Sequence, residues 1–249
     1  MTEVAPNVFC ISCTDVNAVV LRQGSDLTLI DGGWPGDVDA IEKALESIGH
    51  TPQDIRAILL THAHIDHLGA VQAFHDRFKI PVYADSVEIR HAAREYIEQA
   101  SEGDVLKGPM PQTTDWYQRV LKVGADKDIT ISDVQPVAPG PMDVPGRPVA
   151  IATHGHTSGH SAFYVAEARA IITGDCLVTD HAVSTIKGPQ PCPWFFNHSI
   201  PDALSALKEL KSVDADVIVP GHGQPLKMPI SQAVDIALKA AEESGFSKH

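Results

Sequence analysis

The stretch LLTHAHIDHLGA, from Leu59 to Ala70, constrains the fold of this chain more than any other segment. It continues an apolar run, Ala57–Leu60, that is typical of a buried β-strand, and three histidines and an aspartate follow within six positions. Open α/β sheets place their ligand sites beyond the carboxyl ends of the strands, where loops and helix N-termini meet. The stretch therefore predicts a polar site at the end of a strand.

Three later segments repeat this design, in which an apolar run ends at a turn and a side chain able to bind metal follows. The three runs are Val149–Thr153, Ala170–Thr173 and Val217–Pro220. The side chains that follow them include His154, His156, His160, Asp175 and His222. Crowded nitrogen and oxygen donors suit a divalent cation such as zinc. A polar helix start capped by Asp66 is the alternative for the first cluster, but packing alone accounts poorly for four such clusters.

Strand-like and helix-like patterns alternate along most of the chain, which indicates α/β organisation. The other strand candidates are Asn17–Leu21, Leu27–Ile30, Pro81–Ala84 and Ala162–Val165. Helical patterns cover Val38–Ile48, Leu68–Phe78, Pro201–Lys211 and Ser231–Glu243. We expect one domain over residues 1–249, with irregular insertions near the site at about 95–148 and 184–199.

Composition argues against several classes of partner. The chain has 32 acidic and 19 basic residues and a net charge of −13, which disfavours nucleic acid and anionic membranes. It shows no signal-peptide pattern and no apolar run long enough for a membrane helix. Four cysteines make no disulfide framework, so we expect a cytoplasmic protein in which Cys10 and Cys13 pack in the core.

The order of the polar residues resembles the full signature of the metallo-β-lactamase-fold hydrolases, over nearly the whole chain. The matching residues are His62, His64, Asp66, His67, His156, Asp175 and His222, and the earlier segment LIDGG places Asp31 at the end of a strand. The fold that this resemblance implies is an α/β, four-layer αββα sandwich of two mixed sheets flanked by helices. The site would lie along one edge of the two sheets.

The resemblance also implies two divalent metal ions per chain, zinc in the first place, with manganese or iron as alternatives. The ligands would be His62, His64 and His156 for one ion, Asp66, His67 and His222 for the other, and Asp175 as the bridge. A hydroxide shared by the ions would attack the carbonyl of an ester, thioester or lactone. Asp66 would hold the attacking water or pass its proton to the leaving group, and Asp31 and His160 would orient the ligands.

The substrate is less constrained. Trp194, Phe195, Phe196 and His181 could form an apolar wall for a small-molecule substrate, or the aromatics could fill the core. Cys176 is either an extra ligand or a small buried side chain, and His154 has no assigned role. Lactonases of this family place a tyrosine three residues after the bridging aspartate, where this chain has Val178. The other possibilities are β-lactam hydrolysis, iron-dependent sulfur or oxygen chemistry, RNA processing, and a metal-stabilised scaffold without turnover. A homodimer is also possible.

Overall fold

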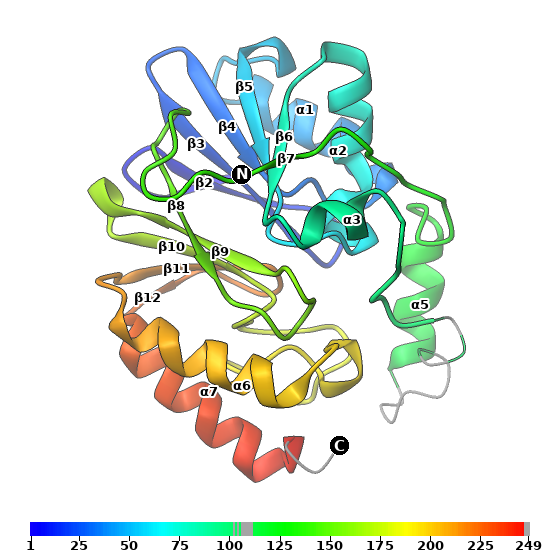
Figure 1. Ribbon diagram of the computed structural model, residues 1–249, viewed down its shortest axis with the longest axis vertical. Coiled ribbons are helices and arrows are strands. Elements are labelled where there is room, and N and C mark those ends of the chain that lie inside the picture. The colour runs from blue at the N-terminus through cyan, green and yellow to red at the C-terminus, as the bar shows by residue number, and fades with distance from the viewer. Residues whose placement is uncertain (102, 104, 106–111, 247–249) are drawn as a thin grey trace.

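The computed structural model describes residues 1–101, 103, 105 and 112–246, and these form two mixed β-sheets (Figure 1). The first sheet has the strand order β1-β2-β3-β4-β5-β6-β7 and the second β12-β11-β10-β9-β8. The first seven strands are Thr2–Ala5, Val8–Ser12, Asn17–Gln23, Asp26–Ile30, Ile55–Leu59, Val82–Ala84 and Gln135–Pro136. Strands β8 to β12 are Val149–Ala152, Ser161–Val165, Ala170–Gly174, Val217–Pro220 and Leu226–Lys227.

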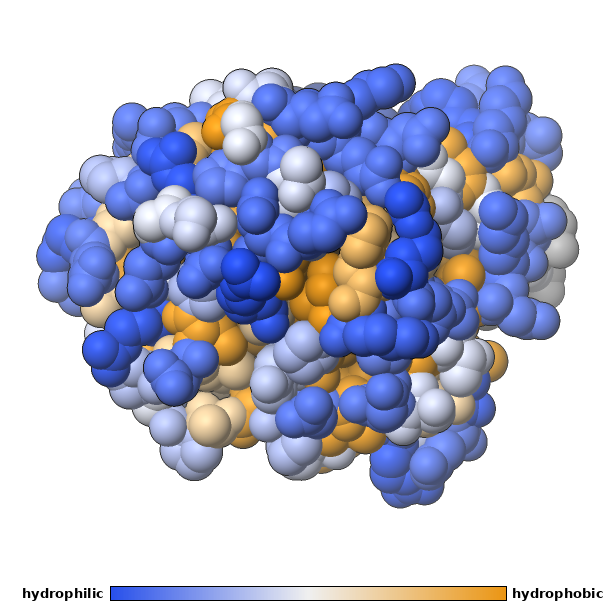
Figure 2. All heavy atoms as spheres, turned by 90° about the horizontal axis from the view of Figure 1, so that it is seen from above, coloured by the Kyte–Doolittle hydropathy of each residue, from blue (hydrophilic) through white to orange (hydrophobic). Residues whose placement is uncertain are grey.

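Helices cover the outer faces of both sheets. The α-helices of the described residues are α1 (Val38–Glu46), α2 (Ile65–Phe78), α3 (Glu88–Ala92), α5 (Thr113–Leu121), α6 (Ile200–Glu209) and α7 (Ile230–Ser244). In Figure 1, α1 and α2 lie behind the first sheet, and α6 and α7 lie below the second. Within the described residues, no helix combines the length and apolar character that crossing a bilayer requires. Figure 2 shows one face covered largely by hydrophilic residues, with apolar residues visible mainly between them.

Alternation along the strands explains why the sheets stack in four layers. In β3, Val19 and Leu21 face the second sheet, whereas Val20 contacts the apolar layer beneath α1 and α2. In β10, Ile172 faces the first sheet, whereas Ile171 packs under α6 and α7. Successive side chains of a strand point to opposite faces, so each sheet has two buried faces and needs a layer on each. The predicted αββα sandwich is confirmed.

All eight predicted strands and all four predicted helices are present, with ends shifted by up to three residues. Helix α2 begins at Ile65 rather than Leu68 because its first turn carries Asp66 and His67, which interrupt the apolar period. The β1–β2 hairpin was not predicted, although the dipeptide Pro6–Asn7 marks its turn and Asn7 adopts a φ of 61°. Helix α5 was also missed, because it lies within a largely polar segment.

A glycine in α2 lets this helix lie against the loop that follows β4. A Cβ at Gly69 would come within 2.4 Å of the backbone nitrogen of Pro35. The same contact region includes a hydrogen bond of 2.8 Å from the Gly32 N–H to the His67 carbonyl. Close packing here therefore fixes the first turn of α2, which carries Asp66 and His67, relative to Asp31.

We expect Gly69→Ala to lower the free energy of unfolding by about 1–3 kcal/mol, because the added methyl group clashes with backbone that cannot move independently. Urea denaturation followed by circular dichroism measures this loss. The control is Lys239→Ala on the exposed face of α7, which should change stability by less than about 0.5 kcal/mol. Equal stability of Gly69→Ala and the wild type would contradict the close approach.

Candidate metal centre

The polar clusters meet because the strands before them end at one edge of the two sheets. Strands β4 and β5 are parallel neighbours in the first sheet, and β10 and β11 are parallel neighbours in the second. The N–H of Ser161 donates to the carbonyl of Thr61 at 2.8 Å, which joins the two sheets at this edge. Four loops far apart in the sequence therefore open into the same space.

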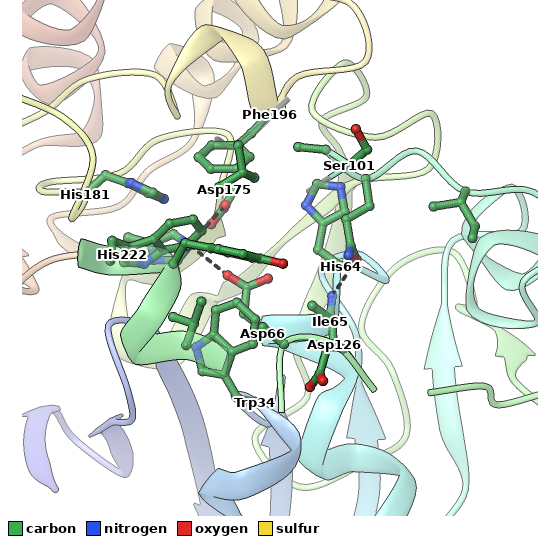
Figure 3. Close-up of a pocket in the computed structure, with 18 residues that line it drawn as sticks. Trp34, His64, Ile65, Asp66, Ser101, Asp126, Asp175, His181, Phe196 and His222 are labelled. Carbon is green, nitrogen blue, oxygen red and sulfur yellow. Dashed lines mark hydrogen bonds and ion pairs between the residues drawn. The ribbon is translucent and has the colours of Figure 1, made fainter. Parts of the chain in front are cut away.

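Among the overlapping groups of three side chains at this edge, two share no member and match the ligand sets expected from the sequence. In each group the possible ligand atoms lie within 4.8 Å of one another, and these two groups are His62, His64 and His156, and Asp66, His67 and His222. His64 Nδ1 and His156 Nε2 are 3.1 Å apart, and His222 Nε2 lies 3.4 Å from Asp66 Oδ2 (Figure 3). Ligand atoms about 2.1 Å from a tetrahedral zinc ion are about 3.4 Å apart. The spacing of both groups fits such an ion.

Asp175 lies between the two groups and contacts both. Its Oδ2 is 3.5 Å from His156 Nε2 and 3.2 Å from His222 Nε2, and its Oδ1 is 3.5 Å from His67 Nε2. The approach of the next loop depends on a glycine, because a Cβ at Gly221 would lie 2.2 Å from Asp175 Oδ1. This carboxylate therefore lies within reach of both triads.

Each of the five imidazoles in these groups is held through its outer nitrogen. The partners of His62, His64, His67, His156 and His222 are Thr61 Oγ1 (3.0 Å), the Glu98 carbonyl (2.6 Å), Asp31 Oδ2 (2.9 Å), Asn197 Oδ1 (3.2 Å) and the Asp15 carbonyl (2.6 Å). These oxygens accept a hydrogen bond from the outer ring N–H, so in the neutral ring the inner nitrogen carries a lone pair directed into the cluster. Such outer partners are the usual support of metal-binding histidines.

Three inner atoms are buried and have no hydrogen-bond partner: His62 Nε2, His67 Nε2 and Asp175 Oδ1. A buried polar atom without a partner costs about 1–3 kcal/mol, so three of them at one point need an explanation. A divalent cation in each group would satisfy these atoms, with His62 Nε2 facing one ion, His67 Nε2 the other and the Asp175 carboxylate between them, since the donors are nitrogen and oxygen. The residues present therefore fit the metal ions that the sequence predicts.

Burial keeps most of the imidazoles near this centre neutral. It is the largest cause of a lowered pKa at five of them, and nearby histidines add to it. These are His64 and His160, each with a pKa of about 4, His181, with a pKa of about 3, and His62 and His156. Metal ions bind the neutral form of histidine. These rings therefore have no proton to lose before a metal ion binds.

The other two imidazoles reveal an excess of negative charge. Burial opposes protonation of His67 and His222, but the nearby carboxylates outweigh it, so the pKa of His67 rises well above its ordinary value and that of His222 to about 10. Burial likewise opposes ionisation of Asp66 and Asp175, yet the two imidazoles hold both pKa values low. The cluster attracts positive charge, which divalent cations supply in place of protons.

The two residues expected to orient the ligands occupy such positions. The Asp31 carboxylate accepts from His67 and also from the N–H and O–H of Thr61, at 2.8 and 2.7 Å. His160 Nε2 accepts the N–H of Asp175 at 3.1 Å, and its Nδ1 donates to Thr153 Oγ1 at 2.8 Å. Asp31 therefore supports one histidine, and His160 supports the backbone of the shared aspartate.

The predicted aromatic wall is only partly correct. Phe196 and His181 line the pocket above the centre, but Trp194 and Phe195 are not among its lining residues. These two belong to the same short 3₁₀ helix as Phe196, in which successive side chains point in different directions. Trp116, from α5, completes the wall, with its ring centroid 5.8 Å from that of Phe196 and 6.3 Å from that of Trp34.

Of the two alternatives for Cys176, the structure shows the small buried side chain. Its side chain packs in the apolar layer under α6, and burial raises its pKa to about 12. The thiol beside the centre is that of Cys192, which donates to Asp175 Oδ2 at 3.4 Å. No local pattern marks this cysteine, since only the fold brings it back to Asp175. His154 lies away from the centre, with Nε2 3.5 Å from Asp85 Oδ2.

The neutral histidines make the stability of the metal-free protein depend on pH. The unfolded chain takes up protons at these sites near pH 6.5, about the ordinary pKa of histidine, whereas the folded chain does not. Stability should therefore fall between about pH 6.5 and 5. The groups with raised pKa, His67 and His222, contribute their full stabilisation throughout this interval. Thermal unfolding in a chelator measures the effect, and a melting temperature that stays constant or rises toward pH 5 would contradict it.

Comparison with known proteins finds relatives that cover most of the chain. Among curated proteins, the chain is similar to the probable metallo-hydrolase YflN of Bacillus subtilis (strain 168), with 26% identity over 239 residues, or 90% of this chain and 86% of the relative. It is also similar to the uncharacterized protein YobT of the same organism, with 28% identity over 230 residues, or 90% and 91% of the two chains.

Solved structures share the fold. A metallo-beta-lactamase family protein from Thermus thermophilus superposes with a TM-score of 0.68 at 23% identity, covering 97% of this chain and 81% of the other. A metallo-beta-lactamase with a HARLDQ motif from Cronobacter sakazakii gives 0.69 at 18% identity, covering 98% and 93%. The sequence profile of the metallo-beta-lactamase superfamily matches residues 11–222. This chain belongs to the metallo-beta-lactamase superfamily.

Proposed function

We propose that this protein is a hydrolase that uses two divalent metal ions to cleave a carboxylic ester, thioester or lactone in a small molecule with an apolar part. One observation carries the proposal. The unpartnered atoms of His62, His67 and Asp175 face one another in a cluster that opens into an apolar pocket. YflN, a relative over most of this chain, is named as a probable metallo-hydrolase, which supports the same class of activity.

The pocket favours an uncharged, apolar substrate group. Its volume is about 480 Å³, within the range of small-molecule sites. Among its lining residues are Trp34, Ile65, Ile97, Val105, Trp116, Tyr117, Val120 and Phe196. No lysine or arginine belongs to the lining among the residues that the structure describes. Away from the proposed metal ions, an anionic group of the substrate would meet Asp126 and no lysine or arginine of the described lining, so the acyl or ring portion of a neutral molecule fits better.

Divalent ions in such a centre supply an activated water and Lewis acidity toward a carbonyl. Asp66 is the ligand carboxylate nearest to solvent, because its side chain is 13% exposed and lines the pocket, whereas that of Asp175 is 4% exposed. We infer that Asp66 accepts the proton of the attacking water and passes it to the leaving group.

His181 is placed to donate a hydrogen bond to the substrate. Its Nδ1 accepts the N–H of Val183 at 3.2 Å, so the neutral ring carries its proton on Nε2. The ring lines the pocket, with its centroid 4.5 Å from that of His222 and 5.2 Å from that of Phe196 (Figure 3). A donor fixed at this point can stabilise the negative charge that develops on the substrate oxygen during hydrolysis.

Chelation and loss of Asp66 should both abolish hydrolysis. We expect zinc, manganese or iron to restore activity to chelated protein on a panel of esters, thioesters, lactones and β-lactams. Asp66→Ala should lower kcat by about 10²- to 10⁴-fold, the usual contribution of a positioned acid–base group. Asp133→Ala, at an exposed aspartate, is the control and should keep wild-type activity. Activity that survives a chelator, or oxygen consumption with one iron per chain, would overturn the proposal.

Replacing the donor of His181 should slow catalysis without removing the metal ions. His181→Phe keeps a ring of similar size but has no N–H, so kcat/KM should fall by roughly 10²-fold. His181→Gln, which retains an N–H donor, should recover part of this loss. Metal content by mass spectrometry serves as the control and should stay at the wild-type level. An unchanged kcat/KM in His181→Phe would restrict this residue to the pocket wall.

A further inference from the structure

A carboxylate outside the ligand groups connects the two loops that supply the first triad. Glu88, at the start of α3, is completely buried. Its Oε1 accepts the N–H of Ala63 at 2.7 Å, between His62 and His64. Its Oε2 accepts the O–H of Thr157 at 2.8 Å and the N–H of Gly159 at 3.1 Å, in the loop of His156.

The fourth hydrogen-bond donor to Glu88 is His91, which also links Glu88 to Glu98. His91 donates through Nδ1 to Glu88 Oε1 at 2.7 Å, and its Nε2 accepts the N–H of Glu98 at 3.2 Å. The carbonyl of Glu98 in turn accepts the ring N–H of His64 at 2.6 Å. The carboxylate of Glu98 also accepts the N–H and the O–H of Ser158, each at 2.6 Å. Segment 88–98 is therefore hydrogen-bonded to the loop of His62 and His64 and to the loop of His156, once through Glu88 and once through Glu98.

Two further contacts show that segment 88–98 lies directly against the backbone of both loops. A Cβ at Gly159 would lie 2.4 Å from the backbone nitrogen of Glu88 and 2.8 Å from its Oε2, so only glycine permits the contact. Arg94 donates through Nη1 to the carbonyl of Ala63 at 2.9 Å, so both backbone groups of Ala63 are bound to this segment. These two hydrogen bonds fix the backbone of Ala63, and with it the positions of His62 and His64 on either side.

Burial of a carboxylate is costly, and stability alone does not favour it over a packed apolar side chain. Glu88 accepts four hydrogen bonds, which uses the acceptor capacity of a carboxylate. Three of these come from the two loops that carry His62, His64 and His156. We propose that Glu88 is a positioning residue that sets the distance between these loops and thereby the metal affinity of the first triad. The inference rests on the proposed metal centre but not on the substrate class.

The test measures zinc affinity separately from stability. In Glu88→Gln, one carboxylate oxygen becomes an NH₂ group, which cannot accept from the His156 loop. We expect the folded variant to bind zinc roughly 10- to 100-fold more weakly in competition with a chromophoric chelator, as for other groups that orient ligands. Glu95→Gln, at an exposed glutamate of the same segment, is the matched control and should bind as the wild type does.

A purely structural role would give a different result. Ile41→Val, in the apolar core under α1, should lower the melting temperature of the metal-free protein without changing its zinc affinity. Glu88→Gln that behaves like Ile41→Val, less stable but with wild-type zinc affinity, would overturn the proposal.

If Glu88→Gln fails to fold, Thr157→Val decides, because it removes one donor to Glu88 and should weaken zinc binding several-fold. Wild-type affinity in that variant would likewise refute the role. Neither result depends on finding a hydrolysed substrate.

Discussion

The shared carboxylate of Asp175 is the constraint around which this structure is organised. It is buried between two triads, one of its oxygens contacts a histidine of each, and the other has no hydrogen-bond partner. Without cations, the carboxylates draw protons onto His67 and His222, whereas the first triad stays neutral. Such an arrangement is unfavourable by itself. It becomes favourable when positive charge binds at the point where the two sheets meet.

The fold holds the side chains around Asp175 rigidly. The loops leave the ends of paired strands, and every imidazole of the two triads is fixed through its outer nitrogen. Segment 88–98 joins two of the loops from outside the sheets, and Figure 1 places α3 beside the level at which the sheets meet. Preorganised ligands lose little freedom when an ion binds, so this support contributes to affinity as well as to orientation. On the solvent side, Trp116 and Phe196 make the entrance apolar.

The elements with strong periodicity and the contiguous histidine motif were predictable from the sequence. His62 to His67 follow one buried strand, so their proximity needs no tertiary information. His156, Asp175 and His222 follow separate strands: the rule that ligands collect at strand ends grouped their loops, and the resemblance to the metallo-β-lactamase fold singled them out from neighbours such as His154. Glu88 and Cys192 could not be predicted, because ordinary local sequence surrounds them and only the packing of α3 and of the 184–199 loop brings them near. The prediction that Trp194 and Phe195 line the pocket was wrong for a related reason. The orientation of a side chain in an irregular loop depends on the path of the backbone.

The central claim is that Asp175 joins two metal ions, one in each triad. Anomalous diffraction from crystals of the zinc-loaded protein tests it most directly. The account predicts two zinc peaks, one within ligand distance of His62, His64 and His156 and one within ligand distance of Asp66, His67 and His222, with the Asp175 carboxylate between them. A zinc-loaded crystal with no peak in this cluster, or with zinc only at an exposed histidine such as His198, would contradict it.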